Sequence, residues 1–265
     1  MITVGIDIGS LATKCVALDT NTDKLDYHIC LTSGDSKKAG ECAYTELLKK
    51  SGIKENDISY VVTTGYGREN IPFSNANITE ISAHAIGISF FFPKVKTLLD
   101  IGGQDSKAIK IGEDGRVEDF VMNDKCAAGT GRFLEVIAKA LGVRLEDMGT
   151  ISEQTDTKIK ISNMCAVFAE SEVISLVSKG MPVPEIIKGV HYSIAEKSSV
   201  LLKKICLTEP IAMSGGVAKN IGVVNELNKI FNFKLLVPET PQIIGAVGAA
   251  LIAQKKAERL TKNGK

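Results

Sequence analysis

The chain carries one short pattern twice, and this repeat constrains the fold more than any other feature of the sequence. In each copy an apolar run ends in Asp-Ile-Gly, a short polar turn follows, and a lysine opens a second apolar run. The copies occupy residues 7–14 and 100–107 and align without a gap. Alternating apolar residues after each lysine are typical of a returning strand. The repeat therefore predicts two β-hairpins of one design.

A second pair of matching segments follows the hairpins in the same order. Residues 61–65 and 211–215 each have the pattern of a buried strand that ends in glycine, and Asn70 and Asn220 follow them at the same spacing. A hairpin and a later strand with a glycine turn thus occur twice. This order predicts an α/β fold of two topologically similar halves. The alternative is chance similarity between apolar strands.

The junction between the halves is expected at the Phe-Phe-Phe-Pro segment, residues 90–93. We predict a first half of residues 1–93, which a C-terminal segment, residues 242–265, crosses back to complete. Residues 94–241 form the second half. The polar end of the chain, from residue 255, is expected to fray. Apolar spacing predicts helices over residues 39–51, 82–88, 126–141, 166–178, 184–205 and 242–257.

Composition argues against several classes of protein. The net charge is only +1 and there is no basic run, so nucleic acid is not an expected partner. The longest apolar run, residues 245–253, is too short to span a bilayer, and the N-terminal apolar run meets Asp7 at once. We therefore expect a cytoplasmic protein. The six cysteines include no CxxC pair, which argues against a disulfide framework or a zinc finger.

Two of the cysteines stand in similar surroundings. Cys126 lies in a loop of small residues just ahead of a predicted helix, and Cys165 directly precedes another. The unpaired amides and the dipole of a helix N-terminus favour a negative group, either a free thiolate or a thiolate-ligated cluster. Small neighbours also let a bulky group approach the backbone. The residues alone leave two interpretations open, ligands of an iron-sulfur cluster or small buried cysteines.

The two hairpin turns are candidates for binding phosphate. Glycines let backbone N–H groups point inward, and an aspartate can hold a hydrated magnesium ion. Neither turn has the Walker or the Rossmann pattern. With the glycine turn at residues 214–220, however, the hairpins resemble the actin, heat-shock chaperone and sugar-kinase ATPase superfamily. The resemblance implies two duplicated ribonuclease-H-like halves, with mixed sheets flanked by helices, that carry two phosphate loops and an adenosine loop.

This resemblance also implies roles for single residues. Asp7 and Asp105 would serve Mg²⁺ or position water, and Gln104 would orient the water that attacks ATP. Gln104 and Asp105 are thus the expected catalytic residues. The residues expected to bind ATP or ADP are Asp7, Gly9, Ser10, Thr13 and Lys14 in the first phosphate loop, Gly102, Gly103, Gln104 and Asp105 in the second, and Gly215, Gly216 and Asn220 at the adenosine.

Two of these assignments have direct alternatives. Glu170 or Glu172 would reach the ribose, as acids on the corresponding helix do in the superfamily, or would act only as partners of the helix dipole. Lys14 and Lys107 open returning strands, so either could be an exposed charge instead of a part of the site.

A closer resemblance comes from residues that the general superfamily lacks. Residues 123–133 and 165–172, with Thr-Gly-Tyr-Gly-Arg at 64–68, resemble the activator components of 2-hydroxyacyl-CoA dehydratases and the ATPase subunits of benzoyl-CoA reductases. This implies an oxygen-sensitive homodimer in which Cys126 and Cys165 of both subunits hold one [4Fe-4S] cluster. Such a cluster takes four thiolates, which a two-fold axis can supply from two per chain. The other cysteines, 15, 30, 42 and 206, are expected to be core or surface residues.

The resemblance implies an ATPase coupled to electron transfer. Ferredoxin or flavodoxin would reduce the cluster, and ATP binding and hydrolysis would change the angle between the helices that follow Cys126. The electron would pass to a dehydratase, a benzoyl-CoA-type reductase or another iron-sulfur protein. Ala166 stands where dehydratase activators carry threonine, which leaves the partner open. The alternatives are a small-molecule kinase of the superfamily and a non-catalytic, nucleotide-dependent regulator with a structural or sensing cluster.

Overall fold

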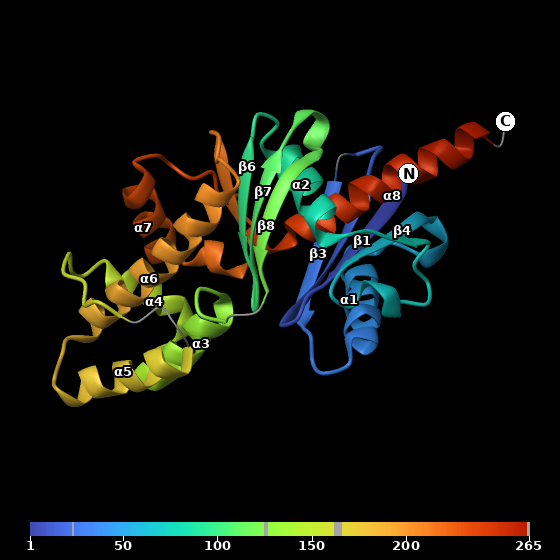
Figure 1. Ribbon diagram of the computed structural model, residues 1–265. Coiled ribbons are helices and arrows are strands. Elements are labelled where there is room, and N and C mark those ends of the chain that lie inside the picture. The colour runs from blue at the N-terminus through green and yellow to red at the C-terminus, as the bar shows by residue number, and fades with distance from the viewer. Residues whose placement is uncertain (23, 125–126, 162–165, 264–265) are drawn as a thin grey trace. The chain divides into compact units, whose positions relative to one another are not determined.

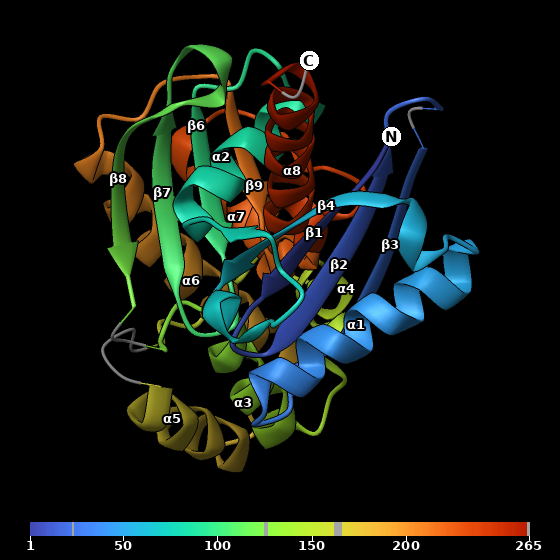
Figure 2. The same ribbon diagram turned by 90° about the vertical axis from the view of Figure 1, so that its right-hand side faces the viewer.

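The structure, a computed structural model, describes residues 1–22, 24–124, 127–161 and 166–263. Contacts divide it into two compact units. The first unit comprises Met1–Val95, Ile111–Glu118 and Gln242–Lys265, and the second comprises Lys96–Lys110 and Asp119–Pro241. Each unit contains one β-sheet with helices packed against it (Figure 1 and Figure 2).

The sheet of the first unit has five strands in the order β3-β2-β1-β4-β5. β2 runs antiparallel to both β1 and β3, whereas β4 runs parallel to β1 and β5 runs parallel to β4, so the sheet is mixed. The strands are β1 (Ile2–Ile8), β2 (Ala12–Asp19), β3 (Lys24–Leu31), β4 (Ile58–Gly65) and β5 (Ala76–Asn77).

Helices cover both faces of this first sheet. α1 (Ser36–Ser51) packs against one face and α8 (Ile244–Asn263) against the other. Because successive side chains of a strand point to opposite faces, Ala17 in β2 belongs to the α1 side and its neighbour Val16 to the α8 side. α2 (Glu80–Phe91) packs along α8. The strands are therefore buried on both faces, as their continuous apolar runs predict.

The second unit has a four-stranded mixed sheet in the order β8-β7-β6-β9. β6 runs antiparallel to β7 and parallel to β9. The turn that joins β7 to β8 is counted with the first unit. The strands are β6 (Thr97–Ile101), β7 (Ser106–Ile111), β8 (Val117–Asn123) and β9 (Ile211–Ser214).

The helices of the second unit share one large apolar core with its sheet. Phe133, Ile137, Val190 and Ile194 are among the fully buried members of this core. The helices are α3 (Gly131–Leu141), α4 (Met148–Ser152), α5 (Ala166–Ser178), α6 (Val183–Lys204) and α7 (Ile221–Phe231). Short 3-10 turns of the two units lie at Glu55–Asp57, Arg68–Asn70, Glu113–Gly115, Leu145–Asp147, Gly216–Lys219 and Pro241–Ile243.

Local sequence signals set the ends of several helices. Asp35 caps α1 by accepting a hydrogen bond from the Lys38 amide, and Thr79 caps α2 through the Ser82 amide. Gly142 ends α3 in the left-handed conformation, with φ of 65°. These capping residues satisfy backbone groups that a helix end would otherwise leave unpaired.

The architecture confirms the predicted fold class, since both sheets are mixed and flanked by helices. Two predicted helix ends differ from the observed ones by more than three residues. α3 begins at Gly131 instead of residue 126, because the Thr130 amide donates to the Ala127 carbonyl and closes a separate turn. The tail from residue 255 was predicted to fray. This prediction is wrong for residues 255–263, because α8 continues to Asn263. Side-chain hydrogen bonds support the extension: Gln254 donates to Glu258 one turn later, and the Thr261 hydroxyl donates to the Ala257 carbonyl, at 2.9 Å.

Candidate functional site

The first hairpin brings Asp7 and Lys14 together. These residues lie directly opposite each other in the β1/β2 register. The Asp7 carboxylate is buried, and its Oδ2 lies 3.1 Å from the Lys14 Nζ. Gly9 closes the turn by donating its amide to the Ala12 carbonyl, at 3.2 Å. A buried carboxylate is costly unless it is paired, so the repeat places its own counter-charge across the hairpin.

The second hairpin repeats this arrangement in the second unit. Asp100 and Lys107 lie opposite each other in the β6/β7 register, with the Lys107 Nζ 3.4 Å from Asp100 Oδ2. The same Nζ lies 2.8 Å from Oδ1 of Asp105. Gly102 closes this turn by donating to the Asp105 carbonyl, at 3.0 Å. The matched aspartates and lysines of the sequence repeat are therefore partners within each hairpin.

The lysines are not exposed charges, which was one of the two predicted alternatives. The side chain of Lys14 is 15% exposed and that of Lys107 is 3% exposed. Hairpin register explains the pairing, because residues equally far from the centre of the turn lie opposite each other. The spacing of the repeat already contains this signal, so the sequence was sufficient to pair each aspartate with its lysine.

Glycine ends the parallel strand beside each hairpin for a steric reason. Gly65 and Gly215 have φ of 84° and 86°. A Cβ at Gly65 would lie 2.5 Å from Asp7 Oδ1, and one at Gly215 would lie 2.2 Å from the Ile101 carbonyl oxygen. No other residue fits the conformation and the space together. In both repeats the buried aspartate therefore lies against a glycine backbone with no side chain between them.

The remaining residues predicted for the first phosphate loop lie around the same turn. Ser10 is half-buried next to Gly9. Thr13 is fully buried, and its hydroxyl lies 2.8 Å from that of Thr32 on β3. The structure therefore places Asp7, Gly9, Ser10, Thr13 and Lys14 in one hairpin of the first unit.

The residues predicted for the second phosphate loop form the turn between β6 and β7. Gly102 and Gly103 are half-buried, Gln104 is exposed and Asp105 is 26% exposed at its side chain. An exposed Gln104 can reach a ligand. Asp105 can offer carboxylate oxygen to a hard cation such as Mg²⁺ although one of its oxygens pairs with Lys107. The carboxylates of Asp7 and Asp105 are the donor type that this ion prefers.

The third predicted element, residues 214–220, is also in the second unit. Gly215 precedes the 3-10 turn at Gly216–Lys219, and Asn220 caps α7. Oδ1 of Asn220 accepts hydrogen bonds from the amides of Gly222, at 3.0 Å, and Val223, at 3.3 Å. Asn220, which is predicted to contact adenosine, therefore also connects this turn to α7 through its side chain.

A buried histidine completes the surroundings of Asn220. Because Oδ1 of Asn220 faces α7, its Nδ2 faces His191 Nε2, at 3.1 Å, and must donate to it. The proton of the neutral ring then lies on Nδ1, which donates to the Ser152 hydroxyl, at 3.1 Å. The hydroxyl of Ser152 donates in turn to the Gly149 carbonyl, at 2.8 Å. Asn220, His191 and Ser152 thus each donate one hydrogen bond along this network.

His191 is neutral because burial and the nearby Lys188 ammonium lower its pKa to about 3. Lys188 is itself buried and donates to the Ser152 carbonyl, at 3.3 Å. Sequence reasoning missed this network. Its only signal was a histidine next to Val190 on the apolar face of a predicted helix, where a partner cannot be identified without the fold.

Glu170 is predicted to reach the ribose, and its contacts within the described residues do not test this role. It is half-buried on α5, which packs against α3 and α6. The 3-10 turn at Gly216–Lys219 contacts α7, β6 and β9. A role for Glu170 at the ribose stays a prediction.

Cys126 and Cys165, the predicted cluster ligands, lie outside the described residues. In the sequence, α3 begins five residues after Cys126 and α5 begins directly after Cys165. In the ranges that the structure describes, no three His, Cys, Asp or Glu side chains converge as a metal site. Burial raises the pKa of the Cys15 and Cys30 thiols, which favours their protonated form. Cys42 and Cys206 are exposed.

No helix within the described residues is both long and apolar enough to cross a membrane.

The arrangement of sheets and helices defines the class of protein. A ROK family glucokinase from Streptomyces griseus matches with a TM-score of 0.61, covering 96% of this chain and 100% of that chain at 15% sequence identity. At this identity the match shows the fold alone, which is that of the actin-like ATPases and sugar kinases.

Closer comparisons define the family. The chain is 42% identical over 265 residues to the 2-hydroxyisocaproyl-CoA dehydratase activator of Clostridioides difficile, covering 100% of this chain and 99% of that protein. It is 37% identical over 274 residues to a benzoyl-CoA reductase subunit of Thauera aromatica, covering 99% and 96%. A solved structure of the activator of 2-hydroxyisocaproyl-CoA dehydratase from Clostridium difficile, with bound ADPNP, matches with a TM-score of 0.95 and 42% identity, covering 100% and 98%.

The profile of the BadF/BadG/BcrA/BcrD ATPase family matches residues 4–253. The chain belongs to this family of ATPases, and the family predicted from its residues is confirmed.

Proposed function

We propose that the chain is an ATP-dependent activator that passes a low-potential electron from a [4Fe-4S] cluster to a 2-hydroxyacyl-CoA dehydratase or a related reductase. The observation that carries this proposal is the similarity to a dehydratase activator along the whole chain. The match therefore includes the segments with Cys126 and Cys165. The benzoyl-CoA reductase subunit, similar over nearly the same length, keeps a ring reductase as a second candidate partner.

The two hairpins support a nucleotide site. In this proposal residues of the 7–14 hairpin and of the 102–105 turn contact the phosphates of ATP, and the turn from Gly215 to Asn220 contacts the adenosine. Asp7 and Asp105 hold Mg²⁺, for which their carboxylate oxygens are suitable donors. Gln104, exposed on its turn, orients the attacking water. The two compact units correspond to the two ribonuclease-H-like halves.

The proposed cluster is shared by two copies of the chain. Cys126 and Cys165 supply two thiolates per copy, so a two-fold axis supplies four. The start of α5, directly after Cys165, supports this, because Val167 and Phe168 are 67% and 70% exposed. Adjacent exposed apolar side chains are typical of a surface that another protein covers. The cluster supplies the electron, and ferredoxin or flavodoxin is the proposed donor.

The energy requirement explains why such an activator would hydrolyse ATP. Raising one electron by about 300 mV costs roughly 7 kcal/mol, whereas coupling between ligands usually supplies about 1 to 3 kcal/mol. Binding energy alone is therefore too small for the step.

The decisive experiment is to purify the protein without oxygen and measure iron, sulfide and visible absorption per dimer. We expect about four iron atoms per dimer and loss of the brown chromophore in Cys126→Ser. The control Cys42→Ser removes an exposed cysteine and should keep the chromophore. Wild-type protein without iron, or a brown Cys126→Ser variant that still delivers electrons, would contradict the proposal. Phosphorylation of a small molecule by a colourless preparation would favour a kinase instead.

A further inference from the structure

Hydrogen bonds connect the 102–106 segment to the start of α3. The amide of Gly131 donates to the Gly102 carbonyl and the amide of Arg132 donates to the Gly103 carbonyl, both at 2.9 Å. The first amides of a helix have no partner within the helix. Here the turn between β6 and β7 supplies their acceptors. α3 is thus anchored on the same turn that carries Gln104 and Asp105.

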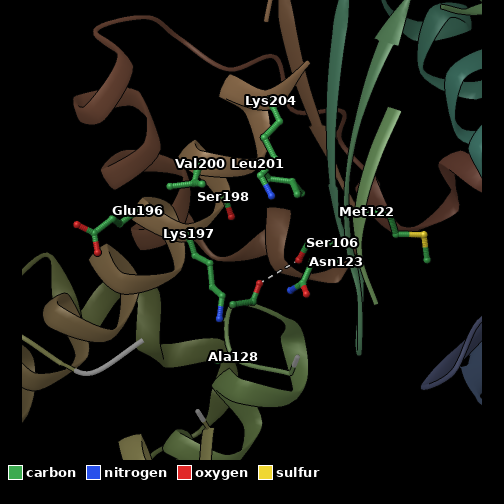
Figure 3. Close-up of a pocket in the computed structure, with 11 residues that line it drawn as sticks. Ser106, Met122, Asn123, Ala128, Glu196, Lys197, Ser198, Val200, Leu201 and Lys204 are labelled. Carbon is green, nitrogen blue, oxygen red and sulfur yellow. Dashed lines mark hydrogen bonds between the residues drawn. The ribbon is translucent and has the colours of Figure 1, made fainter. Parts of the chain in front are cut away.

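Ser106 adds a side-chain bond to this connection. Its hydroxyl donates to the Gly129 carbonyl, at 3.1 Å (Figure 3). Ser106 is the first residue of β7, follows Asp105 directly and is only 4% exposed. A buried carbonyl needs a donor, so the hydroxyl fixes the position of residue 129 relative to the hairpin.

Gly129 is held from another side by α6. Its φ of 95° is a conformation that glycine adopts readily, and a Cβ there would lie 3.1 Å from Cδ of Lys197. The aliphatic part of Lys197 therefore packs against the glycine backbone. The carbonyl of Gly129 is directed to Ser106 by both the glycine conformation and this packing.

A cavity adjoins the connection within the second unit. It has a volume of about 480 Å³ and lies between α6, the start of β7, the end of β8 and the segment at Gly129. Figure 3 shows Ser106 and Asn123 on one side of it and Lys197 on another. Close-packed interiors resist displacement. The cavity leaves room for residues 128–129 to move while α3 stays bonded to the turn.

We infer that Ser106 is a positioning residue that couples the 102–105 turn to the backbone ahead of α3. This inference rests on the proposed function, which places a nucleotide phosphate at that turn. The turn is closed by the bond from Gly102 to Asp105, so a phosphate displaces it as one body together with Ser106. The Gly129 carbonyl follows Ser106, which gives the backbone of residues 127–130, directly ahead of α3, a different position with and without nucleotide.

Hydrogen-deuterium exchange of the full-length, anaerobically purified protein tests this inference. Exchange of the backbone amides of residues 128–130, which precede α3, is compared without nucleotide and with saturating ADPNP. In the wild type, ADPNP should change this exchange rate by about fivefold or more. Ser106→Ala should lose most of that response, and Ser106→Thr, which keeps a hydroxyl, should retain it.

A matched control separates coupling from general destabilisation. Ser193→Ala removes a buried hydroxyl that donates to the Val190 carbonyl, at 2.8 Å, within α6 of the same unit. It should leave the ADPNP response intact. A full response in Ser106→Ala, an equal loss in Ser193→Ala, or no response in a wild type that binds ADPNP would overturn the inference. A wild type that binds no ADPNP would overturn the proposed function as well, which binding calorimetry shows separately.

Discussion

The two repeated hairpins share a backbone and an ion pair but differ in what surrounds the buried aspartate. In the first unit Asp7 meets Lys14, whose side chain is 15% exposed. In the second unit Lys107 is 3% exposed and also meets Asp105, and Asp100 accepts a second bond from the Ser214 hydroxyl, at 2.6 Å. Duplication has thus kept the register and the charge pair.

The difference suggests separate roles for the two hairpins. The Lys14 side chain is more exposed than that of Lys107. Replacing its ion pair with Asp7 by a contact to another anion therefore costs less free energy. Lys107 is fixed by two carboxylates in a water-excluded place. The second hairpin is therefore the more rigid of the two and supports α3, which agrees with its hydrogen bonds to the start of that helix.

The largest expected effect is a difference in stability between Lys107→Met and Lys14→Met. Lys107→Met removes the ammonium that pairs with both Asp100 and Asp105, so we expect a loss of about 3 to 5 kcal/mol in the free energy of unfolding. Lys14→Met should cost about 1 to 3 kcal/mol, because it takes the lysine from one carboxylate instead of two and Lys14 is itself the more exposed lysine. Urea denaturation of both variants measures the difference.

Equal losses in the two variants would contradict this account of the hairpins. They would mean that the depth of burial does not distinguish the pairs. Each variant is the control for the other, since both remove one ammonium from the same hairpin position.

The asparagines that follow the glycine turns extend the comparison. Asn70 donates to the Ser36 hydroxyl, at 2.7 Å, in an exposed place of the first unit. Asn220 in the second unit donates to a buried, neutral His191. The second unit therefore carries a titratable group at a position where the first unit uses a serine hydroxyl.

This group predicts acid sensitivity. The pKa of His191 is lowered from 6.5 to about 3 in the folded protein, so between these values the unfolded chain binds the extra proton. His191 therefore does not lower the free energy of unfolding above about pH 6.5, and it lowers this free energy progressively as the pH falls from 6.5 towards 3. From pH 7 to about pH 4.5 the loss should be about 3 kcal/mol.

The variant His191→Gln identifies this contribution, because glutamine can accept a hydrogen bond but does not titrate in this range. Its free energy of unfolding should fall less between these pH values than that of the wild type, whatever its stability at pH 7. Chemical denaturation at a series of pH values gives both slopes. Parallel curves would show that His191 is not the group responsible.

Much of the fold could be predicted because it depends on local patterns. The repeated Asp-Ile-Gly turns indicated both hairpins, and apolar spacing located helices such as α6 to within a residue of its ends, Val183 and Lys204. The part of α8 beyond its predicted end at Ala257 could not be predicted, because residues 258–263 are mostly polar and do not have the apolar spacing of a helix.

The candidate site was predictable only in part, for the same physical reason. The hairpin residues are neighbours in sequence or in register, so pattern was enough to group them. The His191–Asn220 contact joins two helices that are distant in sequence. Such partners depend on tertiary packing, which periodicity does not specify. Cys126 and Cys165 were identified by their surroundings in sequence, and their role stays a proposal.

The smallest expected effect concerns the hydroxyls beside the two aspartates. Ser214 and Thr64 occupy equivalent register positions, opposite Asp100 and Asp7 in the parallel strand pairs. Ser214 donates to the Asp100 carboxylate, at 2.6 Å, whereas Thr64 donates to the Ile78 carbonyl, at 3.1 Å. A hydrogen bond to a charged group is worth more than a neutral one, so Ser214→Ala should cost about 2 kcal/mol and Thr64→Val about 1 kcal/mol.

These two variants also test whether the second hairpin is the more rigid one. Ser214 and Lys107 both contact the Asp100 carboxylate, so the loss on combining Ser214→Ala with Lys107→Met should differ from the sum of the single losses. The pair Thr64→Val and Lys14→Met should be additive, because Thr64 bonds elsewhere. Thermal denaturation of both double-mutant cycles measures this. Additive losses in both cycles would mean that the side chains around Asp100 are not energetically coupled. The greater rigidity of the second hairpin would then depend only on its backbone hydrogen bonds to α3.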